Sequence, residues 1–321
     1  MTVLTELGSD APSPDVASHN GTGRSGGAGA LVRKMRTGAP VVPFLVYVIL
    51  VLGVPTVVIA VFAFRSNSGA FTFQNIHTIL AAHTAQNPTG GEYRAGFENS
   101  LKLAVVTAVI PGVLGTIIAY AISTSEHPAF KRIVAATSGV LAQFGGVNLA
   151  FMFIAALAET GGLVTKWLGG IGLDPWNHGW SLYQFWGVAL VYMYFQVPLM
   201  VLIITPAFAG LRPAWREAAE GLGASRWRFW RHVGIPVLTP AILGSMFLLF
   251  GSGFSAYATA EALTGGTISI TPIQIGAILQ GNVISGEQNI AYALAFAMIV
   301  ILLLSVIVYV LLRRRTSRWL L

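Results

Sequence analysis

The chain has 321 residues, of which 55% are hydrophobic and 10% are charged, and its formal net charge is +7. A water-soluble domain carries roughly a quarter charged residues, so the composition excludes an ordinary soluble domain and indicates that most of the chain lies in lipid. The sequence contains no cysteine, which excludes disulfides, thiolate metal sites and cysteine nucleophiles. No pair among its six histidines has metal-ligand spacing.

The first segment, residues 1–38, is rich in Gly, Ser, Asp, Asn and Thr and shows no apolar periodicity, which predicts a disordered cytoplasmic tail. It contains a formal GxGxxG at residues 21–26. No strand pattern precedes this motif and no helix pattern follows it, so a dinucleotide site is not indicated. The next apolar run is too long for the core of a signal peptide. We therefore divide the chain into the tail, 1–38, and a transmembrane domain, 39–321.

Six apolar runs follow the tail. Each has about the length that crosses a ~30 Å hydrocarbon core as a helix. The pattern predicts an all-α integral membrane protein with six transmembrane helices. Prolines inside several runs predict kinks, which neighbouring helices tolerate in a membrane. The runs cover residues 41–64, 100–123, 133–158, 183–208, 237–257 and 290–312.

The basic residues are distributed unevenly between the two sides of the membrane when the N-terminus is placed inside. The outside then holds Arg65, Arg94 and Lys166, with Lys102 at a helix end. Short loops with excess Lys and Arg stay in the cytoplasm, so both termini and the loop between the fourth and fifth runs are predicted to be cytoplasmic. The positive net charge therefore indicates topology and not nucleic-acid binding. The inside holds Arg24, Arg33, Lys34, Arg36, Lys131, Arg132, Arg212, Arg216, Arg226, Arg228, Arg231, Arg313, Arg314, Arg315 and Arg318.

The second long outside loop, residues 159–182, carries three tryptophans: Trp167, Trp176 and Trp180. Tryptophan at this position is typical of the interfacial belt of membrane proteins. We interpret the three as membrane anchors in preference to a ligand-stacking site.

The loop at residues 211–236 has the local signals of two short helices joined by a tight turn. Pro213 suits the first turn of a helix, because its missing N–H would be unpaired there in any case. Gly223 fits the left-handed position just past a helix end, and Ser225 is placed to cap the next helix. Pro236 disfavours helical backbone at the residue before it, so the second helix is expected to close there.

The same loop carries the pattern Glu-Ala-Ala, three residues, Gly, nine residues, then Val-x-Ile-Pro. This pattern resembles the cytoplasmic EAA coupling loop of permease subunits in type I ABC importers, which have the MetI-like fold. The alternative, an ordinary amphipathic helix at the lipid head groups, does not account for the whole pattern. The resemblance places the coupling loop at about 209–236, and its ATPase-coupling positions are Glu217, Ala218, Ala219, Gly223 and Ser225.

The resemblance, which covers about residues 40–315, also implies partners and location. The chain has no GxxxxGK[ST] phosphate loop and no Gly-Lys dipeptide, so ATP and Mg are expected on a separate ATPase subunit, and this chain is expected to be neither catalytic nor cofactor-binding. A second permease subunit, identical or homologous, and an extracytoplasmic solute-binding protein are implied as well. The implied location is the bacterial inner membrane.

A finer resemblance concerns the solute. Residues 254–266 and 278–282 resemble segments of polyamine-type permeases, a subgroup with relatives for opines, phosphonates and ferric iron. Ala260 stands where that subgroup usually has proline. Leu222 stands where sugar-type permeases often have Asp. On this basis a polyamine, phosphonate or related solute is favoured over a sugar.

Few polar residues occur at membrane depth, and they are the candidates for lining a solute path. Bridging between helices is an equally good interpretation of such residues, since polar groups in spans usually face the protein interior. For Glu261, near the expected outer mouth, a solvated loop position is a better interpretation than a site that attracts cations. The candidates are Gln143, Asn148, Gln196, Ser252, Ser255, Tyr257 and Glu261.

Two other kinds of protein remain as alternatives. An ATP-independent secondary transporter or channel is disfavoured because no charged residue or histidine lies near the middle of a predicted span, although sodium sites can use backbone carbonyls. The other alternative is a membrane scaffold that transports nothing. An intramembrane enzyme is poorer still, since no base, nucleophile pair or metal cluster converges.

Overall fold

The computed structural model describes residues 41–80, 90–173, 176–281 and 288–317. The predicted disordered tail, 1–38, lies outside these ranges. The chain divides into two units, Met1–Pro55 and Thr56–Leu321. In the first unit the described residues form α2 (Val41–Val48), a π-helical turn η1 (Ile49–Gly53) and the start of α3 (Val54–Ala63). No side chain described between residues 42 and 55 is buried within the chain, as expected of an apolar helix that faces lipid.

The described part of the second unit consists of helices joined by turns and loops, and its one β-type pairing is an isolated bridge between Arg65 and Phe71. The prediction of an all-α membrane protein is therefore confirmed. Beyond α3, its elements are α4 (Gln74–Leu80), α5 (Gly90–Thr124), α6 (Pro128–Gln143), α7 (Gly146–Leu157), α8 (Leu163–Gly170), η2 (Trp176–His178), α9 (Phe185–Ala209), α10 (Pro213–Gly221), α11 (Arg226–Phe229), η3 (Trp230–Gly234), α12 (Ile235–Ser255), α13 (Ala258–Thr264), α14 (Thr271–Leu279) and α15 (Gln288–Ser317).

Five helices in the described residues are long and apolar enough to cross a membrane. They are Val42–Ala63, Gly91–Thr124, Phe185–Ala209, Arg226–Ser255 and Gln288–Arg314. A sixth span results only if α6 and α7, which meet at an angle of 102°, are counted together.

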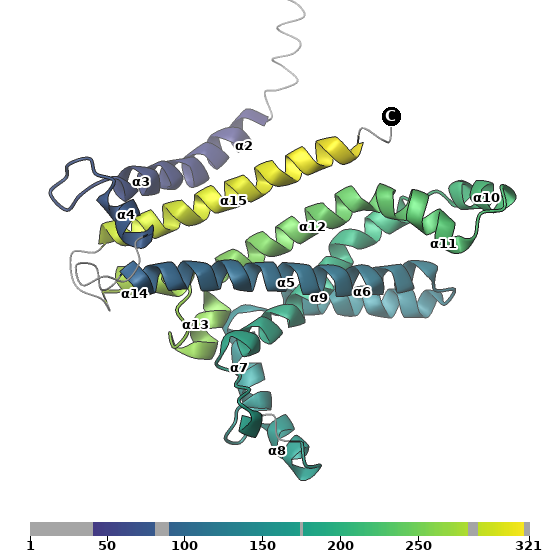
Figure 1. The fold of residues 1–321 in the computed structure, drawn as a ribbon, viewed down its shortest axis with the longest axis horizontal. Coiled ribbons are helices and arrows are strands. Elements are labelled where there is room, and N and C mark those ends of the chain that lie inside the picture. The colour runs from purple at the N-terminus through teal and green to yellow at the C-terminus, as the bar shows by residue number, and fades with distance from the viewer. Residues whose placement is uncertain (1–40, 81–89, 174–175, 282–287, 318–321) are drawn as a thin grey trace, which may run out of the picture. The chain divides into compact units, whose positions relative to one another are not determined.

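The expectation of one continuous helix over 133–158 is thus corrected. The chain breaks after Gln143 because Gly145 is extended (φ −136°, ψ −170°) and Gly146 has a φ of 73°, a left-handed conformation that favours glycine. Figure 1 shows α6 running alongside α5 and α9, while α7 turns away from them.

The centre of this unit is formed by α5, α9 and α12, which pack against one another (Figure 1). α9 lies innermost, with Tyr192, Met200 and Ile204 fully buried. Small residues allow the backbones to approach, as is usual for helices in membranes. A Cβ placed on Gly115 of α5 would lie 2.5 Å from Met200 Cβ and 3.0 Å from the Val197 carbonyl oxygen.

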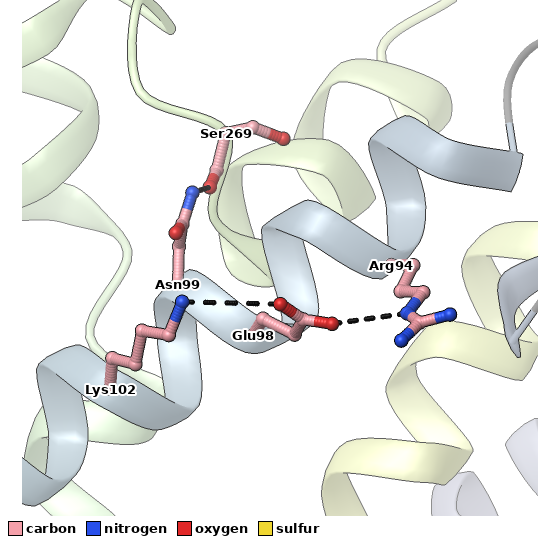
Figure 2. A network of polar contacts seen from close by, with 5 residues as sticks. All are labelled: Arg94, Glu98, Asn99, Lys102 and Ser269. Carbon is pink, nitrogen blue, oxygen red and sulfur yellow. Dashed lines mark hydrogen bonds and ion pairs between the residues drawn. The ribbon is translucent and has the colours of Figure 1, made fainter. Parts of the chain in front are cut away.

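Polar contacts join the N-terminal half of α5 to the segment that leads into α14. The Asn99 side chain donates to the Ser269 carbonyl at 3.0 Å, and the Thr271 N–H donates to Ser100 Oγ at 2.8 Å. Figure 2 shows Asn99 directed toward Ser269, while the neighbouring Glu98 turns to the exposed side. There it pairs with Arg94 at 3.0 Å and Lys102 at 3.9 Å. These contacts join chain segments about 170 residues apart.

Candidate functional site

The loop with the EAA pattern forms two short helices, α10 and α11, joined by a tight turn, as predicted. Gly223 has a φ of 75°. Its N–H donates to the Glu220 carbonyl at 2.9 Å, and the Ala224 N–H donates to the Ala219 carbonyl at 2.9 Å. This pair of hydrogen bonds is the Schellman arrangement, which satisfies the last carbonyls of a helix and requires a left-handed residue just past its end.

The second helix begins as the sequence predicts and ends differently. Ser225 Oγ accepts a hydrogen bond from the Arg228 N–H at 3.3 Å and so caps α11. Closure of the helix at Pro236 is contradicted, because Ile235 is helical (φ −62°, ψ −49°) and residues 226–255 form one span.

A π-helical turn explains how the helix continues through the proline. In η3 the Ile235 N–H donates to the Trp230 carbonyl, five residues back, directly before Pro236. An α-helix would place the proline ring against the carbonyl four residues earlier, and the wider π turn moves that carbonyl away. The same device precedes Pro55, where the Val54 N–H donates to the Ile49 carbonyl. The sequence shows where the prolines are, but it did not predict the π-helical turns that let the helices continue through them.

Aromatic side chains hold the second helix against the ends of α5 and α9. Phe229 is buried. The Trp230 ring meets the Tyr120 ring edge-on, with centroids 4.9 Å apart, and lies 6.4 Å from Phe208. Trp227 remains 70% exposed and borders an apolar cavity of about 440 Å³ beside the same helices.

α10 lies open on the surface of the chain, where a partner can reach it. Glu217 and Ala218 are exposed, and Ala219 is half-buried. Leu222, at the tip, is 89% exposed. The Arg216 guanidinium donates to Glu220 Oε1 at 2.9 Å, and this hydrogen bond and the carboxylate charge raise the pKa of Arg216 above its usual value.

Behind this helix lies a polar cavity of about 390 Å³ that is lined by residues of the loop and of the end of α5. Its lining includes charged residues of both signs: Glu126, Arg216, Glu220 and Arg226. The geometry can hold a partner surface of mixed charge. Among the residues the structure describes, no group of three or more His, Asp and Glu could hold a metal ion.

The seven candidates for a solute path do not form a single cluster. Gln143 and Asn148 are exposed on either side of the break between α6 and α7. Ser255 is exposed, and its hydroxyl donates to the Gly251 carbonyl at 2.8 Å. Ser252 is half-buried on the same helix.

Three further candidates lie elsewhere. Tyr257 Oη accepts a hydrogen bond from Gln280 Nε2 at 3.2 Å. Glu261 is not a solvated loop residue as interpreted, because it lies in α13, is half-buried, and its Oε2 is covered without a hydrogen-bond partner. Gln196 is fully buried in the middle of α9.

Sequence reasoning did not connect Gln196 with Gly253, or with Thr107, which also faces Gly253. Thr107 of α5 is fully buried, and Gly253 of α12 faces both side chains. The run of small residues around Gly253 was the available signal, but nothing in the apolar run of α5 distinguishes Thr107. The tryptophans interpreted as membrane anchors differ in exposure: Trp167 is 66% exposed, whereas Trp176 is buried with its ring edge-on to that of Trp180.

Two curated relatives match part of the chain. It is 25% identical over 177 residues to the sulfate transport system permease protein CysT of Escherichia coli (strain K12), covering 55% of this chain and 61% of that protein. It is 26% identical over 189 residues to the trehalose transport system permease protein SugB of Mycobacterium tuberculosis (strain CDC 1551 / Oshkosh), covering 58% and 61%. The chain spans about three fifths of the length of these relatives.

Two solved structures share the fold. One is a bacterial ABC transporter involved in the import of the acidic polysaccharide alginate, with a TM-score of 0.68 at 18% identity over 89% of this chain and 99% of that chain. The other is a bacterial alginate ABC transporter in complex with an alginate pentasaccharide-bound periplasmic protein. It has a TM-score of 0.65 at 17% identity, covering 91% and 97%. At such identities the likeness shows the fold alone.

A family model covers nearly the whole chain. It matches residues 27–318 and describes a binding-protein-dependent transport system inner membrane component. The match takes in both the spans and the loop with the EAA pattern. This chain therefore belongs to the family of binding-protein-dependent transport system inner membrane components.

Proposed function

We propose that this chain is a transmembrane permease subunit of an ATP-driven ABC importer and forms the translocation path for a small hydrophilic solute. The observation that carries the proposal is the loop at 209–236. Its first helix is exposed, its turn is fixed by Gly223, and its second helix continues into a span that reaches the packed centre of the chain. Family membership supports the same function.

In this proposal the coupling positions are Glu217, Ala218, Ala219, Gly223 and Ser225. The two alanines keep one side of α10 narrow, so the helix fits a groove of an ATPase subunit. Glu217 offers an exposed negative charge to that partner. Gly223 and Ser225 shape the turn and the cap that hold α10 at a fixed angle to α11.

The proposed complex contains two ATPase subunits, a second permease subunit, identical or homologous, and an external solute-binding protein. ATP and Mg belong to the ATPase, while this chain binds no cofactor. The family description, a membrane component of a transport system, confirms the expectation that the chain is not itself catalytic. The proposed location is the bacterial inner membrane, with both termini in the cytoplasm.

The identity of the solute is left open. The preference for a polyamine or phosphonate is not supported, because relatives named for transport of sulfate, trehalose, ferric iron and spermidine/putrescine all match and the solved structures are named for alginate. Sulfate and sugars are therefore as plausible as the solutes of the polyamine-type subgroup. Each of these compounds is hydrophilic, which agrees with the proposed path.

The proposed mechanism follows from the connection between loop and spans. Closure of the ATPase dimer on ATP brings the two coupling loops together. Because α11, η3 and α12 are one helix, this movement reaches the centre of the membrane domain and switches the path from inward-facing to outward-facing. Hydrolysis then resets the cycle.

The first test is mass spectrometry of the complex purified with this chain in mild detergent. We expect an ATPase with a phosphate loop and a solute-binding protein, whose bound ligand identifies the solute. Recovery of the chain alone, with solute flux into vesicles that lack ATP, would replace this proposal with a secondary transporter.

A charge reversal tests the coupling loop itself. Glu217→Arg is expected to abolish co-purification of the ATPase and uptake, while the chain still inserts in the membrane. The matched control is Glu159→Arg, the same change at an exposed position on the opposite side of the predicted topology. Normal uptake by Glu217→Arg would exclude the coupling role.

A further inference from the structure

The least satisfied polar side chain in the centre of the molecule is Gln196 of α9. It is 0% exposed. Neither its Nε2 nor its Oε1 has a hydrogen-bond partner in the described part of the chain. Burial of an amide without partners costs free energy, and most buried polar groups in native proteins are paired. The conformation in hand is therefore unfavourable for this side chain.

Two helices close over the Gln196 amide. A Cβ placed on Gly253 of α12 would lie 3.1 Å from Gln196 Nε2 and 2.6 Å from Thr107 Oγ1 of α5. Only glycine allows so close an approach without displacing a neighbour. Thr107 is 0% exposed, and its hydroxyl donates to the Leu103 carbonyl at 2.8 Å. We call Thr107, Gln196 and Gly253 the three-helix node.

The node lies where α12 ends. The helix stops at Ser255, and Ala256 is extended (φ −71°, ψ 117°). The Tyr192 hydroxyl, one turn before Gln196 on α9, donates to the Ala256 carbonyl at 2.9 Å. Tyr192 and Gln196 both lie within the α9 span. The end of α12, which contacts them, therefore lies well inside the membrane domain. Irregular backbone at such depth is tolerated where it is buried in protein or lines a water-filled cavity.

The node and the turn of the coupling loop lie at opposite ends of one continuous helix, residues 226–255. Residues 226–255 are helical without a break, a length of about 45 Å at 1.5 Å per residue. Figure 1 shows α11 and α12 continuing one another from the loop toward the centre. A displacement of the loop relative to α5 and α9 therefore moves Gly253 away from Gln196 and Thr107, or back onto them.

We propose that the Gln196 amide is a solute contact that is covered by Gly253 in the present conformation and uncovered when α12 moves. This inference rests on the proposed importer function and concerns the same path. The amide offers a donor and an acceptor, and the three residues of the node, Thr107, Gln196 and Gly253, carry no charge. The site therefore suits a neutral solute that carries hydroxyl groups, as a sugar does, and not a polyamine dication.

The chain has no cysteine, so Thr107→Cys introduces a single thiol into the node. The complex with its ATPase is reconstituted and treated with a water-soluble maleimide, and labelling of this chain is measured by mass spectrometry. We expect labelling to be at least tenfold faster with ATP and vanadate than without nucleotide. Equal rates in the two states would overturn the inference.

Two further substitutions should change the rate of maleimide labelling without nucleotide, in opposite directions. Gln196→Leu removes the unpaired amide and should slow labelling at Thr107→Cys, because the closed node becomes more favourable. Gly253→Ala adds a Cβ that the closed node cannot hold and should speed labelling. The controls are Gln184→Leu, at the exposed start of α9, and Gly251→Ala, where the nearest atom to the added Cβ is Leu302 Cδ2 at 3.6 Å. If Gln196→Leu and Gly253→Ala both speed labelling, or both slow it, the proposed closure of Gly253 over Gln196 is contradicted.

The solute class is tested by protection of the thiol with ATP and vanadate present. A panel of neutral sugars including trehalose is compared with putrescine. Protection by a sugar supports the assignment, whereas protection by putrescine, or by none of these compounds, overturns it. Absence of an ATPase from the complex would refute the importer function itself. Labelling that ignores ATP in an intact complex would refute only the role of Gln196.

Discussion

The coupling loop and the three-helix node each depend on a glycine, for opposite reasons. Gly223 has a φ of 75°, and nothing lies within 4 Å of the position its Cβ would take. Gly253 lies in the last turn of α12, and its Cβ would collide with Thr107. The first glycine is required by the backbone and the second by its neighbours, so a substitution should act locally in the loop and across helices in the node.

The two regions also differ in what surrounds them. Leu222 at the tip of the loop is 89% exposed, whereas Gln196 and Thr107 in the node are 0% exposed. The loop is shaped by hydrogen bonds between residues close in sequence, such as Ala224 to Ala219. The node exists only because three separate helices meet. Substitutions ranked by expected effect can test this difference.

The largest effect is expected where helices pack most closely. Gly115→Val would drive a side chain into Met200 and the Val197 carbonyl, and overpacking of this kind costs about 1–3 kcal/mol, with higher values where backbone is in the way. We expect the yield of monodisperse protein in detergent to collapse. Gly139→Val, in α6 with nothing within 4 Å of the added Cβ, is the control. Equal yields for the two variants would show that the interior is looser than its geometry indicates.

A smaller effect is expected from Gly223→Val in the loop. Left-handed backbone costs a residue with a side chain about 1–2 kcal/mol. The turn between α10 and α11 should open, and ATPase should be lost from the purified complex while the thermal midpoint of the membrane domain changes little. Gly221→Ala, which also meets nothing within 4 Å and lacks a positive φ, should retain the ATPase. A large drop in the midpoint for Gly223→Val would contradict a purely local role.

Removal of the Ser225 cap should have a weaker effect. Loss of a capping side chain costs about 1 kcal/mol. Ser225→Ala should therefore speed hydrogen exchange at the Arg228 amide, which donates to Ser225 Oγ, by roughly fivefold. Ser225→Asp restores an acceptor and should restore slow exchange. No difference between the two variants would show that the cap does not stabilise α11.

The smallest effect is expected from the exposed pair of Arg216 and Glu220. Both side chains are about half exposed, and exposed pairs of this kind contribute little to stability because water screens the charges. Because the pKa of Arg216 is raised, any stabilisation is complete below the pKa of arginine in the unfolded chain and is lost only as pH rises through the folded value. Arg216→Gln should thus leave the thermal midpoint nearly unchanged from pH 6 to pH 9. A pH-dependent change in that range would contradict this assignment.

The loop was the part of the site that the sequence predicted best. The Schellman turn at Gly223 and the cap at Ser225 follow from preferences of single residues for particular backbone conformations. The exception is Pro236, where a π turn continues the helix that proline was expected to end. Such a turn depends on how the whole span is held and not on the residue alone.

The solute-path candidates were predicted less well. The sequence grouped the polar residues of the apolar runs as one set of candidates, but the structure separates Gln143 and Asn148, beside the bend between α6 and α7, from Gln196 in the node. Thr107 and Gly253 were not identified as partners of Gln196. The bend itself depends on backbone at Gly145 and Gly146, and two adjacent glycines are compatible with either a helix or a break.

The sequence by itself determined the membrane class, the spans to within a few residues for three of the six runs, and the turn that carries the proposed coupling function. These depend on transfer of apolar side chains from water to lipid and on local backbone preferences, both of which act over short segments. Only the tertiary structure decided that residues 107, 196 and 253 meet. In a span such as α9, the side chains that face lipid and those that face protein are both apolar, so the sequence has no amphipathic stripe to indicate which face is buried.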